Sequence, residues 1–86
     1  MSIEDLKRLK SDVNEIIKSL DRTKISGVNW LDLSCVSATH CVDDDGYEYQ
    51  MVLIEEADPD CTYLPDAVRR ALLERGWKNV AIETAW

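Results

Sequence analysis

The stretch from Asp43 to Gly46 constrains the fold most, because it joins two segments that have the composition of β-strands. Residues 28–42 and 47–56 are rich in β-branched and aromatic side chains, which favour extended strands. Between them, three aspartates can bond to their own backbone, and a glycine can adopt positive φ without strain. The pattern predicts an antiparallel hairpin with an acidic tip.

A helix is predicted before the hairpin, over residues 2 to about 20. Ser2 can cap its first turn. Apolar side chains then recur at spacings of three and four residues, which places them on one face of a helix. This apolar stripe consists of Leu6, Leu9, Val13, Ile16 and Leu20.

A second helix and a third strand are predicted after the hairpin. Pro65 suits the first turn of a helix, where its missing N–H is not needed. Gly76 is a typical C-terminal stop, and Trp77 just beyond it can pack back on the last turn. Apolar and polar residues alternate over residues 79–86, which is typical of a strand.

These elements predict a single α+β domain over residues 1–86, in the order α-β-β-α-β. A strand-helix-strand crossover is right-handed, so the second and third strands are expected to run parallel. With the first strand placed between them, the sheet is mixed and three-stranded, in the order 2-1-3. Both helices then cover one face, and the other face stays open.

Side-chain size is the basis for predicting which face of the sheet is covered. In the second strand, the row of Tyr47, Tyr49, Met51 and Leu53 holds the larger apolar groups, so we expect it to face the helices. The alternate row, with Val52 and Ile54, is then expected on the open face. The first strand alternates less regularly, and a bulge near residues 35–37 would reconcile its two halves.

The distribution of charge is uneven along the chain. The net charge is −7, yet residues 25–61 hold nine acidic residues and neither lysine nor arginine. A block of this sign repels a nucleic-acid backbone, so direct nucleic-acid binding is not expected. Its acids are predicted to form a rim at the two ends of the hairpin rather than one patch.

Neither a metal site nor a cofactor site is predicted. Cys35 and Cys41 share a strand but are separated by about 20 Å at roughly 3.3 Å per residue, and His40 points to the opposite face. Structural zinc needs closely spaced ligand pairs on turns. The three cysteines, with Cys61 the third, fit free thiols in a reducing compartment.

An enzyme is not expected either. The one histidine, His40, projects away from its neighbour Cys41, and no phosphate-binding or nucleophile-elbow motif is present. The longest uninterrupted apolar run, residues 51–54, is far too short to cross a membrane. The N-terminal residues lack the apolar block of a secretory signal, so a cytoplasmic protein is predicted.

The favoured function is a small acidic module that binds a basic protein surface, as an inhibitor, an antitoxin-like or immunity-like partner, or a nucleic-acid mimic. Its predicted binding residues are Asp43, Asp44, Asp45, Glu48, Val52, Ile54, Glu55, Glu56, Asp58 and Asp60. The alternative is a structural homodimer that pairs two open sheet faces through Val36, Val42, Val52 and Ile54. Under a third interpretation, the acids only solubilise the chain and protect a sheet edge.

Overall fold

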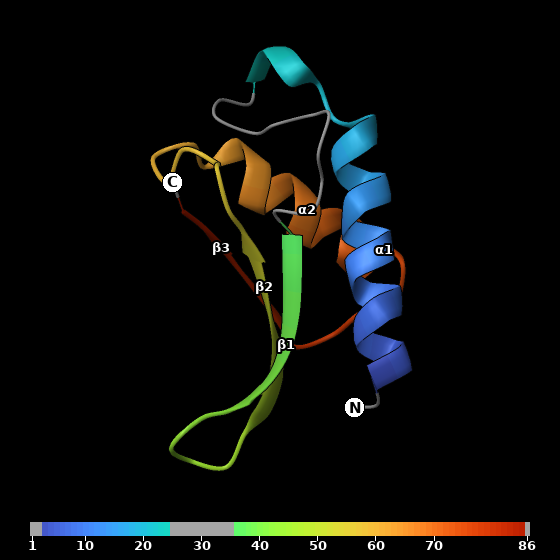
Figure 1. The fold of residues 1–86 in the computed structure, drawn as a ribbon, viewed down its shortest axis with the longest axis vertical. Coiled ribbons are helices and arrows are strands. Elements are labelled where there is room, and N and C mark those ends of the chain that lie inside the picture. The colour runs from blue at the N-terminus through green and yellow to red at the C-terminus, as the bar shows by residue number, and fades with distance from the viewer. Residues whose placement is uncertain (1–2, 25–35, 86) are drawn as a thin grey trace.

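A computed structural model describes residues 3–24 and 36–85 (Figure 1). Its elements are α1 (Ile3–Ser19), the 3₁₀ turn η1 (Arg22–Lys24), β1 (Val36–Val42), β2 (Glu48–Ile54), α2 (Tyr63–Glu74) and β3 (Val80–Thr84). The predicted α+β class, with an α-β-β-α-β order and a mixed sheet, is confirmed. Ser2 and Cys35, for which the sequence analysis makes predictions, lie outside the described residues.

The strand order differs from the prediction. β1 pairs antiparallel with β2, β2 pairs parallel with β3, and β2 is the central strand. The predicted order 2-1-3 is therefore wrong, although the parallel relation of β2 and β3 is correct. α1 packs on β1 while α2 packs on β3, so α2 crosses between adjacent strands and does not have to pass over β1.

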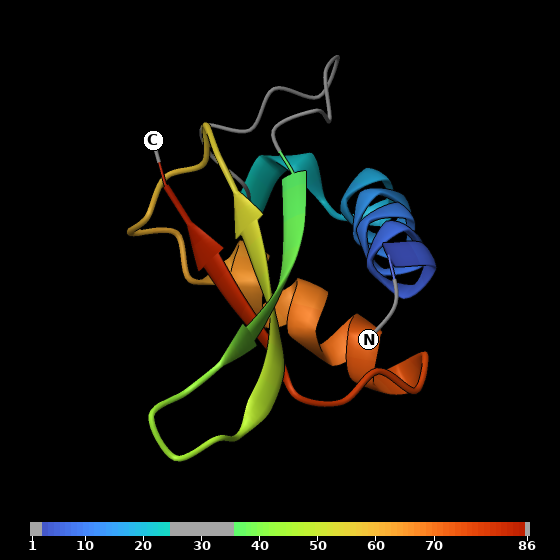
Figure 2. The ribbon, with the colours of Figure 1, turned by 60° about the horizontal axis from the view of Figure 1, so that its bottom comes forward.

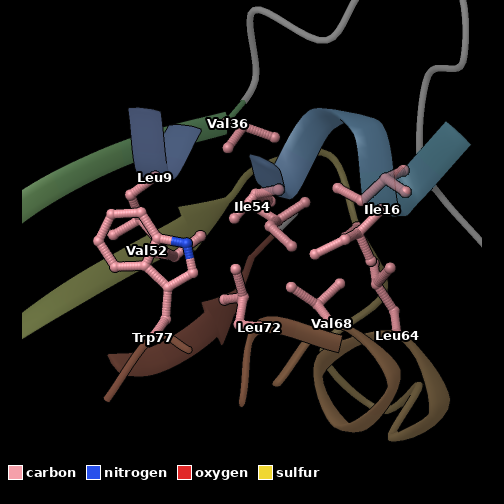
Figure 3. Packing of buried hydrophobic residues seen from close by; sticks show 12 residues of the cluster. Leu9, Ile16, Val36, Val52, Ile54, Leu64, Val68, Leu72 and Trp77 are labelled. Atoms are coloured by element: carbon pink, nitrogen blue, oxygen red, sulfur yellow. The ribbon is translucent and has the colours of Figure 1, made fainter. Parts of the chain in front are cut away.

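Both helices cover the same face of the sheet, as predicted (Figure 2). Between the helices and the sheet lies one hydrophobic core (Figure 3). Its helical members are Leu9, Val13, Ile16 and Ile17 from α1, and Leu64, Val68 and Leu72 from α2. Its strand members are Val36, Val52 and Ile54, each no more than 1% exposed.

The predicted face of β2 is wrong, because Val52 and Ile54 face the helices. The hairpin register explains this result: Val36 lies opposite Ile54 and Ala38 opposite Val52, without interruption to the end of β1. Even-numbered residues of both strands therefore share one face. No bulge interrupts the pairing from Val36 onward, and the rest of the predicted bulge lies outside the described residues.

The C-terminal end of α2 forms the predicted glycine stop. Gly76 has φ +93°, its N–H donates to the Leu73 carbonyl at 3.1 Å, and the Trp77 N–H donates to the Leu72 carbonyl at 3.0 Å. These two bonds define a Schellman motif. Pro65 lies in the first turn of α2, as predicted, and Trp77 returns to the core at 8% exposure.

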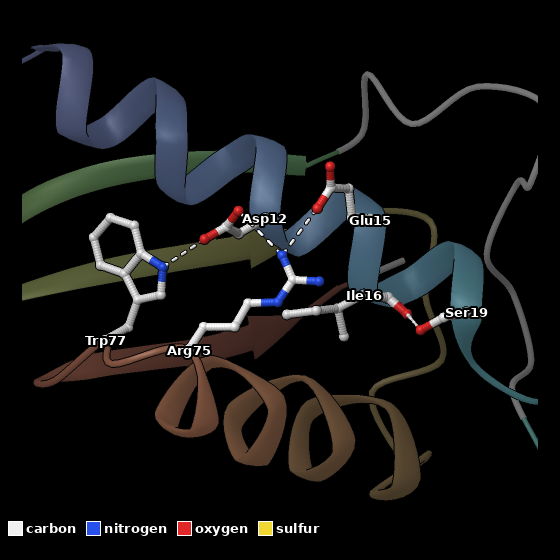
Figure 4. Close-up of polar contacts among 6 residues, drawn as sticks. All are labelled: Asp12, Glu15, Ile16, Ser19, Arg75 and Trp77. Atoms are coloured by element: carbon white, nitrogen blue, oxygen red, sulfur yellow. Dashed lines mark hydrogen bonds and ion pairs between the residues drawn. The ribbon is translucent and has the colours of Figure 1, made fainter.

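A polar cluster ties this helix end to α1 (Figure 4). The Trp77 indole N–H donates to Asp12 Oδ2 at 2.7 Å, and Arg75 Nη1 contacts Asp12 Oδ1 at 3.1 Å and Glu15 Oε2 at 2.9 Å. The Arg8 guanidinium lies 4.8 Å from the centre of the Trp77 ring. The polar cluster holds the loop between α2 and β3 against α1.

Candidate functional site

The tip of the hairpin is built around Asp43. Its Oδ1 accepts hydrogen bonds from the backbone N–H groups of Asp45 (3.0 Å) and Tyr47 (2.8 Å). The Gly46 N–H donates to the Asp43 carbonyl at 3.0 Å, and Gly46 has φ +81°. This is a three-residue loop closed by a left-handed glycine. One of the three tip aspartates therefore shapes the turn itself.

The remaining acids near the tip expose their carboxylates to solvent, where they can attract a charged partner. Asp44, Asp45 and Glu48 are exposed, and the tip extends past the ends of both helices (Figure 1). Glu48 Oε1 lies 3.7 Å from His40 Nε2 across the strand pair. The buried Gln50 side chain lies next to His40, with its Nε2 3.4 Å from His40 Nδ1. The hairpin thus presents carboxylates on an arm supported by cross-strand contacts.

The open face of the sheet carries the row of Tyr49, Met51 and Leu53, all of which are half-buried. Electrostatic repulsion from Cys41, directly opposite Tyr49 on β1, raises the pKa of Tyr49, and the partial burial of Tyr49 raises it further. Asp43 and Glu83 also raise the pKa of Tyr49, by smaller effects. The carboxylates of Asp43 and Glu83 therefore act electrostatically on Tyr49, at one end of this apolar row.

The other predicted acids lie at the far end of β2. Glu55, Glu56 and Asp60 are exposed, and Asp58 is partly buried. Asp58 Oδ1 accepts the Asp60 N–H at 2.9 Å, which forms a local turn. The hairpin tip and this group lie at opposite ends of the central strand. The predicted binding acids therefore form two separate groups, as expected from the sequence.

Two predicted binding residues cannot form an exposed surface. Val52 and Ile54 are both 0% exposed, because their row of β2 packs under α1 and α2. The homodimer surface expected from Val36, Val42, Val52 and Ile54 cannot consist of these residues, since three of the four side chains are in the core. Val42 alone is exposed, at 57%.

A pocket of about 300 Å³ lies where β2 extends past the start of β3, and the sequence interpretation missed it. Tyr47 and Tyr49 line it from the hairpin side, and Leu73 lines it from α2. The available signal was Leu73 itself, an apolar residue on the helix face that carries Arg69. Apolar side chains on a charged helix face have no core to enter.

Among residues 3–24 and 36–85, no group of three or more histidine, cysteine or acidic side chains is placed to hold a metal ion. In the same part of the chain, every helix is too short or too polar to cross a membrane. No protein-family model, curated protein or solved structure compared with the chain matches it.

Proposed function

We propose that the chain is a protein-binding module that engages a basic protein surface through its acidic hairpin and its helix-free sheet face. The observation that carries this proposal is the continuity of the two features on β2. Exposed carboxylates of Asp44 and Asp45 lie in the turn just before β2, and the half-buried apolar row of the open face begins at Tyr49, the second residue of that strand. A polar, charged rim around an apolar centre is the usual anatomy of a protein interface.

The sign of the charge selects the partner. The carboxylates and the net charge of −7 attract a positively charged surface over distances of about a Debye length, roughly 8–10 Å at physiological salt. Nucleic-acid-binding proteins carry surfaces of this kind, so an inhibitor or a nucleic-acid mimic fits the proposal. Self-association through the same face would bring two strongly acidic copies together, which disfavours the homodimer.

The proposal is tested by charge removal at the tip. We would substitute Asp44→Ser and Asp45→Ser together and keep Asp43, because its carboxylate closes the turn. The matched control is Glu4→Gln with Glu74→Gln, two exposed acids on the helices whose loss changes the net charge equally. Both variants are compared with the unchanged protein.

The measurement begins with affinity capture from cells and mass spectrometry, and continues with the purified main partner. We expect a basic partner whose association rate falls about tenfold or more with the tip variant or with rising salt, and little with the control. An acidic partner, or equal rates for the two variants, would contradict the proposal.

A further inference from the structure

The pocket beside the hairpin is placed where the sheet narrows. β3 begins with Val80, opposite Gln50, so Tyr47 and Tyr49 lie before the first paired residue of β3 and have no β3 neighbour in the sheet. The C-terminal half of α2 forms the facing wall. Its volume of about 300 Å³ is at the lower end of the roughly 300–1,000 Å³ of ligand pockets and suits a single large side chain.

Exposed apolar side chains gather at this pocket. Within the described residues, four large hydrophobic side chains remain mostly exposed: Ile3, Val42, Tyr47 and Leu73. Tyr47 (60% exposed) and Leu73 (58% exposed) both line the pocket, although they come from different elements. Two apolar walls that stay in contact with water on either side of a hollow favour an apolar occupant.

The floor of the pocket is already formed before any ligand binds. Trp77 is held by the Schellman motif, by its bond to Asp12 and by the stacked Arg8. Asn79 has φ +58°, and its carbonyl accepts the Gln50 N–H at 2.9 Å. An occupant therefore does not need to order these walls, which lowers the entropic cost of binding.

The charge around the pocket favours a positive neighbour for that occupant. The Asp43 carboxylate is close to the pocket, because its Oδ1 accepts a hydrogen bond from the Tyr47 backbone N–H at 2.8 Å. Glu83 is exposed on the open face of β3. Arg69 is the single cation among the lining residues, and its Nη2 is 3.1 Å from Asp66 Oδ1. This ion pair offsets the attraction that Arg69 would exert on an anion.

We propose that this pocket binds a large apolar side chain that is flanked by basic residues in the partner protein. The inference rests on the proposed function for the basic character of the partner, and it adds the apolar side chain that anchors the complex. Burying a leucine or phenylalanine against Tyr47, Leu73 and Trp77 removes apolar surface of both molecules from water. The carboxylates then contact the flanking cations.

The probes are acetylated and amidated pentapeptides with two lysines on each side of a central leucine, phenylalanine or alanine. A second series has glutamates in place of the lysines. Binding to the full chain is followed by nuclear magnetic resonance, using the Trp77 indole and the Leu73 and Ala81 amides. We expect the lysine peptides with leucine or phenylalanine to bind about tenfold tighter than the alanine peptide.

A pair of variants separates the pocket from general apolar exposure. Tyr47→Ala with Leu73→Ala removes two pocket walls, and Ile3→Ala with Val42→Ala removes two side chains of similar exposure elsewhere. The first variant is expected to bind the leucine peptide no better than the alanine peptide, while the second keeps the tenfold difference. Equal affinity of the unchanged protein for both peptides would overturn the inference.

The outcomes also separate the inference from the proposed function. If lysine peptides bind regardless of their central residue and lose affinity in the Asp44→Ser, Asp45→Ser variant, the pocket is refuted and the acidic surface stands. Tighter binding of the glutamate series would refute the proposal that basic residues flank the bound side chain, because Arg69 would then bind an anion. Tight, pocket-dependent binding of the lysine series with leucine supports the inference.

Discussion

Asp12 joins two parts of the molecule through one carboxylate. It accepts the Trp77 indole N–H and the Arg75 guanidinium, while its side chain is only 23% exposed. Asp12→Ala leaves the indole donor without its partner, so we expect the free energy of unfolding to fall by about 2 kcal/mol. Urea denaturation followed by circular dichroism measures this change.

Glu15 supplies the control for Asp12, because it contacts the same Arg75 from a more exposed position. Glu15→Ala removes one solvent-accessible ion pair, which contributes no more than about 1 kcal/mol. If the two substitutions lowered the free energy of unfolding equally, the Trp77 bond would contribute nothing beyond the ion pair.

Asp21 is a residue whose protonation can be followed directly. The Thr23 hydroxyl donates to Asp21 Oδ1 at 2.7 Å and the Thr23 N–H at 3.0 Å, and these bonds lower the pKa of Asp21 below its ordinary value. Thr23→Val removes the hydroxyl bond, so the pKa of Asp21 is expected to rise. Carboxyl ¹³C titration measures it, and Thr39→Val, which does not touch Asp21, should leave the pKa unchanged.

The sign of the pH dependence follows from this lowered pKa. The folded state holds the Asp21 proton more weakly than the unfolded chain does, so stability from the carboxylate is fully present above the unfolded pKa. It is lost as the pH falls through the lower pKa of the folded state. Thr23→Val should therefore reduce the acid sensitivity of unfolding in this range, and an unchanged pH profile would contradict the assignment.

At the scale of single elements, Gly76 is the point on which the end of α2 depends. A Cβ at this position would meet no atom within 4 Å, so the penalty for Gly76→Ala comes from φ +93° alone. We expect a loss of about 1–2 kcal/mol in the free energy of unfolding. Gly76→Asn should cost less, because asparagine tolerates the left-handed region. Equal losses for the two variants would mean that the backbone angle is not the cause.

Element boundaries were predictable wherever a local signal decided them. Both helices, the hairpin and the stop at Gly76 follow from periodicity, turn residues and backbone freedom, which act over a few residues. The covered face of β2 was not predictable from side-chain size. Tyr49 and Met51 are larger than Val52, but the pairing register set by the turn places Val36 and Ala38 of β1 opposite Ile54 and Val52.

The missed pocket has a similar cause at the level of the candidate site. The pocket is lined by Tyr47, Leu73 and Trp77, which come from three segments. No sequence pattern indicates that β3 begins only opposite Gln50 and so leaves space between these side chains. By contrast, the acidic tip was predictable, because charge counts need no tertiary structure. The distinct role of Asp43 within that tip depended on its hydrogen bonds.

For the whole molecule, the covered and open faces of the sheet predict losses of stability of different size at neighbouring positions. Ile54 is 0% exposed beneath the helices, so Ile54→Ala should lower the free energy of unfolding by about 2–5 kcal/mol. Leu53 is half-buried on the open face, and Leu53→Ala should cost no more than about 1.5 kcal/mol. Chemical denaturation compares them, and the reverse ranking would mean that the sheet is covered on its other face.

The strand order also belongs to this scale, because it depends on how two helices share one surface. Single-strand patterns permit either order 2-1-3 or order 1-2-3. Once α1 packs on β1, α2 can cover only the remainder of the sheet, which brings β3 beside β2. The decisive constraint is therefore competition for space between helices that are far apart in sequence.

The bond between Asp12 and Trp77 joins residues 65 positions apart, and this separation has a consequence for synthesis. When ribosomes complete α1, its apolar stripe has none of its partners from α2 or the following loop. At roughly 5–20 residues per second, the stripe remains without these partners for several seconds. During that interval the nascent chain offers chaperones a binding segment that the finished protein conceals.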